Sequence, residues 1–256
     1  VLVGTGKYFE NCDANVDKSR AMTLYGIWDR KTRRQSTEYD DYAQKNRVRA
    51  NLQKQEFITQ QDSEKFGEEG KEVVNDIRLL SQNTVQWYKD PEDLGGSVDP
   101  SKDEHVEKWG WRLDLAIEET DEETWDDSLE RNGKQTLAGE MVINNMAARG
   151  NTLLLSTLTP NDDPCQAGAI TWFYGVNAYT GGRTPKNILD LNNDRAFNGL
   201  DKFSGRVVSG RRFNAPGGFT MSPGGVFGEG GQPPMTLPDV IGAPRQSWHI
   251  IPEDFQ

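Results

Sequence analysis

The chain contains 256 residues, enough for one large all-β unit or two smaller domains. Its formal net charge of −11 argues against nucleic acid as a partner, because nucleic-acid binding relies on positive charge. No apolar run approaches the roughly 18 residues that a membrane-spanning helix needs, so no transmembrane segment is expected.

Short strand patterns follow one another along the chain. The opening stretch, Val1–Phe9, is β-branched and punctuated by glycine. It has no visible signal peptide before it, and we interpret the chain as a processed form or as a fragment of a longer protein. Further strands are expected in residues 21–29, 54–61, 83–88, 108–117, 139–145, 151–160 and 169–182, the last ending in a glycine-rich turn at Asn177–Gly182. Many short strands with glycine-rich turns predict a single all-β domain over residues 1–256, built as a sandwich, barrel or propeller.

Three segments stand apart from these strand patterns. Residues 40–55 are charged all round, which favours a surface segment over a core helix. Residues 118–130 carry eight acidic side chains and no basic one, which predicts a solvated acidic loop, with a cation- or partner-binding surface as the alternative. Residues 214–244 are rich in Gly and Pro and are expected to form an extended loop across the surface.

Oxygen-bearing side chains are concentrated in "ILDLNNDRAFNGLDKF", residues 188–203. Counted from its first Asp, the stretch follows the ligand positions of an EF-hand-type calcium loop. The matching residues are Asp190, Asn192, Asp194, Ala196 through its backbone carbonyl, Asn198 and Asp201. Because Ca²⁺ takes about six to eight hard oxygen ligands, the pattern predicts a calcium site; a polar turn without metal is the alternative.

Two positions depart from the EF-hand pattern. Arg195 stands where Gly normally permits a sharp turn, and Asp201 is shorter than the usual Glu. No amphipathic helix pair flanks the loop, so we expect it to join β elements. Asp13, Asn15 and Asp17 repeat part of the alternation, which is typical of a turn and marks a second, weaker candidate cation site.

The chain shows no catalytic motif. The two cysteines, Cys12 and Cys165, lie outside any C-x-x-C pair, so a cysteine-based zinc site is not expected. The sequence is compatible with two alternatives for these cysteines, namely one long-range disulfide or two free buried thiols. His105 and His249 lack a neighbouring ligand or nucleophile, and no G-x-S-x-G, H-E-x-x-H or phosphate-binding loop is present.

Several segments, taken in order, resemble the C-terminal domain of the PilY/PilC-type type IV pilus proteins. The entry "VLVGTGKYFE" is followed by "TLYGIWD", then by "KWGWRLDL", which is similar to a Gly-Trp-x-x-x-Leu segment of the family. The long segment "LLLSTLTPNDDPCQAGAITWFYGVNAYTGG", the Asp/Asn loop "LDLNNDRAFNGLD" and the closing "RQSWHII" complete the set. The landmarks cover nearly the whole chain in the family's order.

This resemblance implies an all-β, quinoprotein-like β-propeller domain with long loops, of which the chain is long enough to hold only some blades. It implies a non-catalytic adhesin or assembly factor at the tip of a type IV pilus, with Ca²⁺ as a regulator. Pilins or minor pilins would be its partners, together with a host or surface ligand. The protein would act at the cell surface, after export through the periplasm of a Gram-negative bacterium.

Two other functions are compatible with this kind of β domain. One is a periplasmic quinoprotein dehydrogenase, although such enzymes usually carry a vicinal disulfide and this chain has no adjacent cysteines. The other is an extracellular glycan-binding module, in which Trp109, Trp111 or Trp125 would stack on sugars. Tryptophans in alternating strands are more often part of the core.

Overall fold

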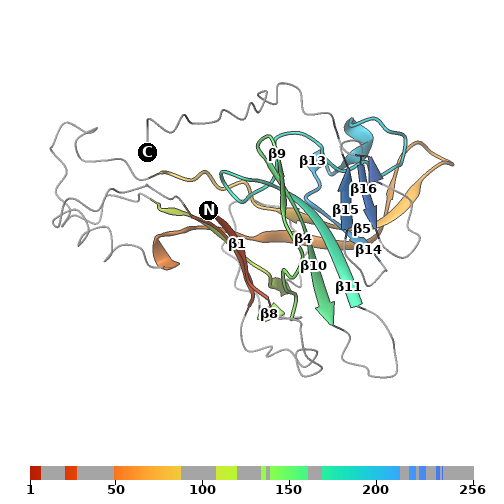
Figure 1. The fold of residues 1–256 in the computed structure, drawn as a ribbon. Helices are drawn as coiled ribbons and strands as arrows, with labels where there is room; N and C mark the ends of the chain where they lie inside the picture. The colour runs from red at the N-terminus through yellow and green to blue at the C-terminus, as the bar shows by residue number, and fades with distance from the viewer. Residues whose placement is uncertain are drawn as a thin grey trace, which may run out of the picture.

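The structure is a computed structural model. It describes residues 1–6, 21–27, 49–87, 108–119, 134–136, 139–160, 169–213, 219–222, 225–228, 235–236 and 238. Within these ranges the chain forms strands and two short 3₁₀ turns, and no α-helix (Figure 1). The prediction of an all-β fold is therefore confirmed.

A four-stranded sheet is formed by the first third of the chain and β6. Its order is β1 (Leu2–Gly4), β2 (Thr23–Ile27), β6 (Gly110–Asp114) and β3 (Gln53–Gln55). The pairs are antiparallel except β3 with β6, which run parallel. The turn η2 (Arg49–Asn51) leads into β3, so the charged segment 40–55 ends in a strand.

A six-stranded antiparallel sheet makes up the centre of the molecule. Its order is β4 (Phe57–Phe66), β5 (Val73–Leu80), β14 (Gly210–Phe213), β11 (Ala169–Asn177), β10 (Thr152–Pro160) and β9 (Ala147–Arg149). The long β10–β11 hairpin is prominent in Figure 1. The short strand β14 pairs with β11 on one side and β5 on the other, so it joins two hairpins that are distant in sequence.

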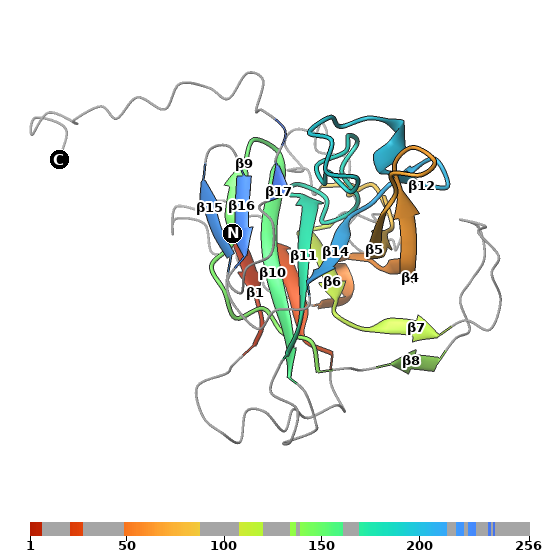
Figure 2. The same cartoon turned by 90° about the vertical axis from the view of Figure 1, so that its right-hand side faces the viewer.

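Smaller ribbons surround these sheets. They are β7 (Ile117–Glu119) with β8 (Lys134–Thr136), β12 (Lys202–Phe203) with β13 (Arg206–Val207), and β15 (Phe219–Ser222) with β16 (Gly225–Gly228) and β17 (Met235–Thr236). The β7–β8 ribbon extends to one side of the molecule in Figure 2. The last three strands correct the prediction of an extended loop over residues 214–244, since glycine-rich sequence there forms a small sheet. None of the described sheets closes on itself.

Both faces of the six-stranded sheet are buried. Leu153 and Leu155 of β10 belong to one apolar cluster, whereas Leu154 belongs to a second. Successive side chains of a strand point to opposite faces, so the two clusters lie on the two sides of the sheet. The first cluster also contains Trp111 from the four-stranded sheet, which packs the two sheets together.

Trp111 is held in a narrow slot. Its side chain is fully buried, and its indole N–H donates to the carbonyl of Ala178 at 3.1 Å. A methyl group at Gly26 or Gly181 would overlap the indole ring. Gly181 also has a φ of 73°, which confirms the predicted glycine turn after β11.

Two predicted strands are wrong. Residues 83–86 form no strand, and Trp87 makes only an isolated bridge with Lys108. Residues 139–145 likewise contribute only the bridge between Met141 and Leu158. Val85 and Met141 are buried all the same. These runs are apolar because they cover the core. Periodicity alone does not distinguish a buried irregular segment from a strand.

A buried polar cluster lies between Glu140 and the six-stranded sheet. Arg78 of β5 donates to Glu140 at 2.5 Å and also to the hydroxyl of Tyr174. Glu140 accepts from Tyr174 at 2.8 Å and from Thr157 at 2.5 Å. The guanidinium stacks 3.9 Å from the ring of Trp172. Burial alone would lower the pKa of Arg78, but Glu140 and Tyr174 together raise it above its usual value, so the cation is stable in this setting.

This cluster predicts a loss of stability at alkaline pH. Burial raises the pKa of Tyr174 well above its ordinary value of about 10; Glu140 acts in the same direction, and Arg78 opposes it. Above pH 10 the unfolded phenol ionises while the folded one keeps its proton, so the free energy of unfolding falls as pH rises. Tyr174→Phe is expected to reduce this slope by up to about 1.4 kcal/mol per pH unit.

Denaturant unfolding at pH 9, 10 and 11 measures the slope. The control is Thr157→Val, which removes another hydrogen bond to Glu140 but no phenol. An identical slope for Tyr174→Phe and the unmodified chain would show that Tyr174 is not responsible.

Candidate metal centre

The segment that leads into the predicted calcium loop is anchored in the core. Ile188, Leu189 and Leu191 are buried in the second apolar cluster. The side-chain amide of Asn75 on β5 donates to the carbonyl of Leu191 at 2.7 Å. The loop therefore starts from a fixed point on the six-stranded sheet.

The first candidate ligand organises the turn that follows it. Asp190 is only 2% exposed, and its two carboxylate oxygens accept the backbone N–H groups of Asp194 at 3.2 Å and Arg195 at 3.0 Å. Asn193 and Arg195 have φ angles of 59° and 64°, so the chain makes the sharp turn in the left-handed region. Arg195 thus adopts, without glycine, the conformation that its position in the loop requires.

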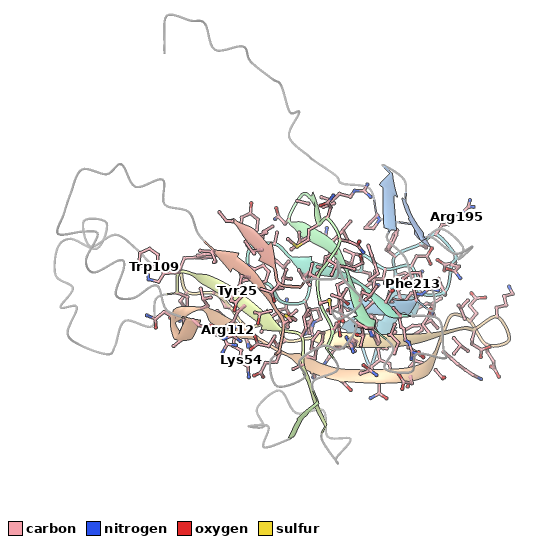
Figure 3. All side chains as sticks on the ribbon, turned by 60° about the horizontal axis from the view of Figure 1, so that its bottom comes forward. Tyr25, Lys54, Trp109, Arg112, Arg195 and Phe213 are labelled. Atoms are coloured by element: carbon pink, nitrogen blue, oxygen red, sulfur yellow. The ribbon has the colours of Figure 1, made fainter. Side chains whose placement is uncertain are left out.

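The tip of the loop is exposed and rich in oxygen. Asp194 accepts from the backbone N–H of Ala196 at 2.7 Å and from the side chain of Asn192 at 2.8 Å. The side-chain oxygen of Asn192 accepts the N–H of Asp194 at 3.2 Å. A side chain at Gly67, in the β4–β5 turn, would touch Asn192, so the tip of the loop lies against that turn. Figure 2 shows this turn at one end of the six-stranded sheet. Figure 3 shows Arg195 at the opposite end of the molecule from Trp109.

The last two candidate ligands cap the 3₁₀ turn η3 (Gly199–Asp201). Asn198 is the N-cap, and its side-chain oxygen accepts the N–H of Leu200 at 2.7 Å. Asp201 is 1% exposed and accepts the N–H of Asn198 at 3.0 Å. The structure therefore brings all six predicted positions into one continuous, hydrogen-bonded loop.

The buried carboxylates of the loop carry unfavourable charge. Burial raises the pKa of Asp190, with the charge of Asp194 acting in the same direction, while hydrogen bonds from backbone amides oppose it. Burial also raises the pKa of Asp201, and the charges of Asp190 and Asp194 add to this. Burial lowers the pKa of Arg211 on β14, and the charge of Asp190 opposes that effect. A cation at the loop would relieve the repulsion among the three carboxylates.

The donor set suits a hard divalent cation by its chemistry, because it offers carboxylate, amide and carbonyl oxygens and no sulfur or imidazole. Each carboxylate oxygen has two acceptor sites, so an N–H bond leaves room for a second interaction. Within the part of the chain that the structure describes, no three side chains of Asp, Glu, His or Cys are grouped closely enough to hold a metal ion by themselves. Amide and backbone oxygens would have to complete the ligand set.

The other predicted site residues fall into two groups. Cys12, Cys165, Asp13, Asn15, Asp17, both histidines and Trp125 lie outside the described residues, so the disulfide and the second cation site stay predictions. Trp109 and Trp111 are described, and they are 4% and 0% exposed. Buried rings cannot stack on a sugar, so these two tryptophans are not glycan-binding platforms.

Sequence reasoning missed the residues that support the loop. Asn75 fixes its entry, and Asn187 donates its side-chain amide to the carbonyl of Asn198 at its exit. Asn75 lies on a strand, distant in sequence from the loop, and no local pattern connects it with a metal site. Asn187 directly precedes the predicted stretch, and this closeness in sequence is the one signal that could have identified it as a supporting residue.

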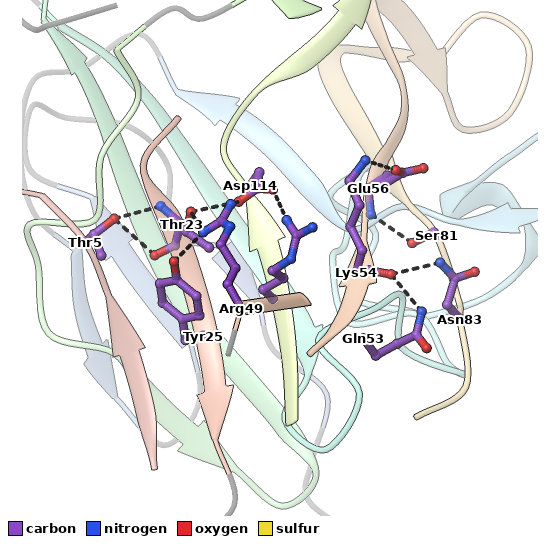
Figure 4. A network of polar contacts seen from close by, with 11 residues as sticks. Thr5, Thr23, Tyr25, Arg49, Gln53, Lys54, Glu56, Ser81, Asn83 and Asp114 are labelled. Atoms are coloured by element: carbon purple, nitrogen blue, oxygen red, sulfur yellow. Dashed lines mark hydrogen bonds and ion pairs between the residues drawn. The ribbon is translucent and has the colours of Figure 1, made fainter. Parts of the chain in front are cut away.

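A second polar network lies on the four-stranded sheet (Figure 4). Asp114 accepts from Thr23 at 2.7 Å and forms ion pairs with Arg49 and Arg112. Arg49 also donates to the hydroxyl of Tyr25. These contacts link β2, β6 and the turn η2, so the network ties the sheet together across its strands.

Comparison with known proteins places this architecture in a class. A model of the PilY1 beta-propeller domain matches residues 1–69. The crystal structure of the Pseudomonas aeruginosa PilY1 C-terminal domain superposes with a TM-score of 0.67 and 33% identity, over 93% of this chain and 41% of that one. The strand-rich, open-sheeted fold is thus part of a propeller-type domain, as the family resemblance implied.

The relatives found by sequence comparison define the class of protein more narrowly. Type IV pilus biogenesis factor PilY1 of P. aeruginosa strain UCBPP-PA14 is 40% identical over 222 residues, and that of strain PAO1 is 38% identical over 226 residues. The chain belongs to the PilY/PilC-type family of type IV pilus proteins. The matches cover 87% of this chain but only 16% of each relative's length. Among the described residues, no helix is long and apolar enough to cross a membrane.

Proposed function

We propose that the chain is part of a non-catalytic, type IV pilus-associated protein that acts in pilus assembly and adhesion and binds Ca²⁺. The pilus role is supported by the relatives, which are named type IV pilus biogenesis factors and are up to 40% identical over most of this chain. On this proposal the protein acts at the cell surface with pilins or minor pilins as partners.

The calcium part of the proposal is carried by the loop from Asp190 to Asp201. Asp190 accepts the N–H groups of the fifth and sixth loop positions, which bends the chain back towards this carboxylate. The donors would be the side-chain oxygens of Asp190, Asn192 and Asp194 with the carbonyl of Ala196. When bound, Ca²⁺ would neutralise carboxylates that repel one another in its absence.

Asp194→Asn is expected to weaken calcium binding on the order of 100-fold, because calcium affinity depends strongly on the number of charged ligands. Isothermal titration calorimetry measures the change. In the unmodified chain, Ca²⁺ at about 100 times its dissociation constant should stabilise the fold by about 2.7 kcal/mol, and the variant should lose most of this gain.

The matched control is Glu56→Gln. Glu56 is a partly exposed acidic residue just before β4, at the end of that strand away from the β4–β5 turn, and its substitution removes the same unit of charge. Equal calcium binding by Asp194→Asn and Glu56→Gln would contradict the site.

Cells test the role in pili. A strain that lacks the natural protein would be complemented with the intact protein or with its Asp194→Asn form. Surface pili and attachment are expected to be restored by the intact protein and reduced with the variant. Full restoration by the variant would separate calcium from pilus function, and no requirement for the protein at all would overturn the pilus role.

The non-catalytic part of the proposal has its own test. It is supported by the relatives, whose name describes biogenesis and no reaction. Purified protein mixed with pyrroloquinoline quinone is expected to show no bound-cofactor absorbance and no dehydrogenase turnover. Turnover with bound quinone would favour a quinoprotein enzyme instead.

A further inference from the structure

Asp201 differs from the other carboxylates of the loop in that it joins the two ends of the loop. Its Oδ1 accepts the backbone N–H of Leu191 at 2.8 Å, and its Oδ2 accepts the backbone N–H of Asn198 at 3.0 Å. Leu191 lies at the beginning of the loop and Asn198 near its end. A single buried carboxylate therefore bridges the two ends.

Each end that Asp201 bridges is also fixed from outside the loop. The carbonyl of Leu191 accepts from Asn75, and its side chain is fully buried in the core. The carbonyl of Asn198 accepts from the side chain of Asn187. Asp201 thus connects a rigid entry on the sheet with the exit turn that carries Asn198.

Asp194 makes the opposite kind of contact. Its side chain lies on the exposed tip and accepts hydrogen bonds from Ala196 and Asn192, which belong to the tip as well. Asp201 is 1% exposed and faces inward to amides. Asp190 is as deeply buried as Asp201 and also accepts two backbone N–H groups, but both come from the turn directly after it. Among the three carboxylates of the loop, Asp201 is therefore the one that connects the two ends, which suits it to a brace.

We propose that Asp201 is a positioning residue, which closes the loop around the ligands between Asp190 and Asn198 and does not itself bind the cation. The calcium part of this inference rests on the proposed function. The bracing part does not, since both hydrogen bonds of the bridge are made to backbone amides of the chain itself.

Asp201→Asn tests the inference. The asparagine keeps one acceptor oxygen but turns an NH₂ group towards a backbone N–H, so one buried amide loses its partner. With chelator present, we expect the melting temperature to fall by about 3–10 °C. Calcium affinity, measured well below the melting temperature, should weaken about 10-fold, with one ion still bound per chain.

Asp194→Asn is the contrasting variant. Neutralising an exposed ligand removes repulsion in the metal-free loop, so its melting temperature in chelator should stay the same or rise, while its affinity falls much further. Thr157→Val is the structural control, because it weakens the separate cluster around Glu140. It should lower the melting temperature and leave calcium affinity unchanged.

The outcomes separate the two proposals. An unchanged or raised melting temperature of Asp201→Asn in chelator would overturn the brace. A lowered melting temperature with unchanged calcium affinity would overturn the positioning role. If the unmodified chain binds no Ca²⁺, the calcium site fails, and a lowered melting temperature of Asp201→Asn would still support the bridge.

Discussion

Glu140→Gln is expected to lower the free energy of unfolding by about 3–5 kcal/mol, because it leaves the Arg78 guanidinium as an uncompensated buried charge. The two side chains are 5% and 2% exposed, so water cannot replace the lost carboxylate. Urea or guanidinium unfolding at pH 7, compared with the exposed substitution Glu69→Gln, measures the loss.

A double variant shows whether the buried charge is the cause. In Arg78→Met combined with Glu140→Gln, the remaining amide can still bond to Tyr174 and Thr157, and no charge is left in the core. We expect this chain to recover at least half of the lost stability. A loss below about 1 kcal/mol for Glu140→Gln alone would show that the ion pair contributes little.

Trp111→Ala is expected to cost about 3–5 kcal/mol, since it empties a slot between the two sheets. The backbones of Gly26 and Gly181 lie directly against the indole, so at these two places no side chain can move in to fill the space. Chemical denaturation measures the loss. Trp111→Phe retains a ring and should be less damaging.

Gly181→Ala tests the same slot by adding a methyl group to its wall. Its methyl group would overlap the indole, and its φ of 73° is unfavourable for alanine. The two single substitutions share one packing defect, so their effects should not add when combined. Full additivity would argue that Gly181 and Trp111 act independently.

Alternation of apolar residues was a good guide where a strand buries ordinary side chains. It located β6, β10 and β11, whose tryptophans and leucines form the core. It did not indicate β5 or β14, because Arg78 and Arg211 interrupt the apolar pattern. Arg78 is tolerated through Glu140 and Tyr174, which are distant in sequence, and such partners are invisible in a local pattern.

The candidate metal loop stays a prediction, which the sequence could make because calcium ligands follow one another at fixed spacing. The bridge made by Asp201 could not be predicted, because its partners are backbone amides, which every residue has. The sequence supplies the carboxylate, but only the folded loop shows which N–H groups it reaches.

The position of β14 has a consequence for how the protein is made. The β4–β5 and β10–β11 hairpins can each form from neighbouring sequence, but among the described strands only β14, at residues 210–213, joins them. Until that strand emerges from the ribosome, one edge of each hairpin is open and able to pair with another chain. Such long-range closure is slow compared with hairpin formation. A protein shortened before residue 210 would keep both edges exposed, so a chain that is still being made gains from shielding until the sheet is complete.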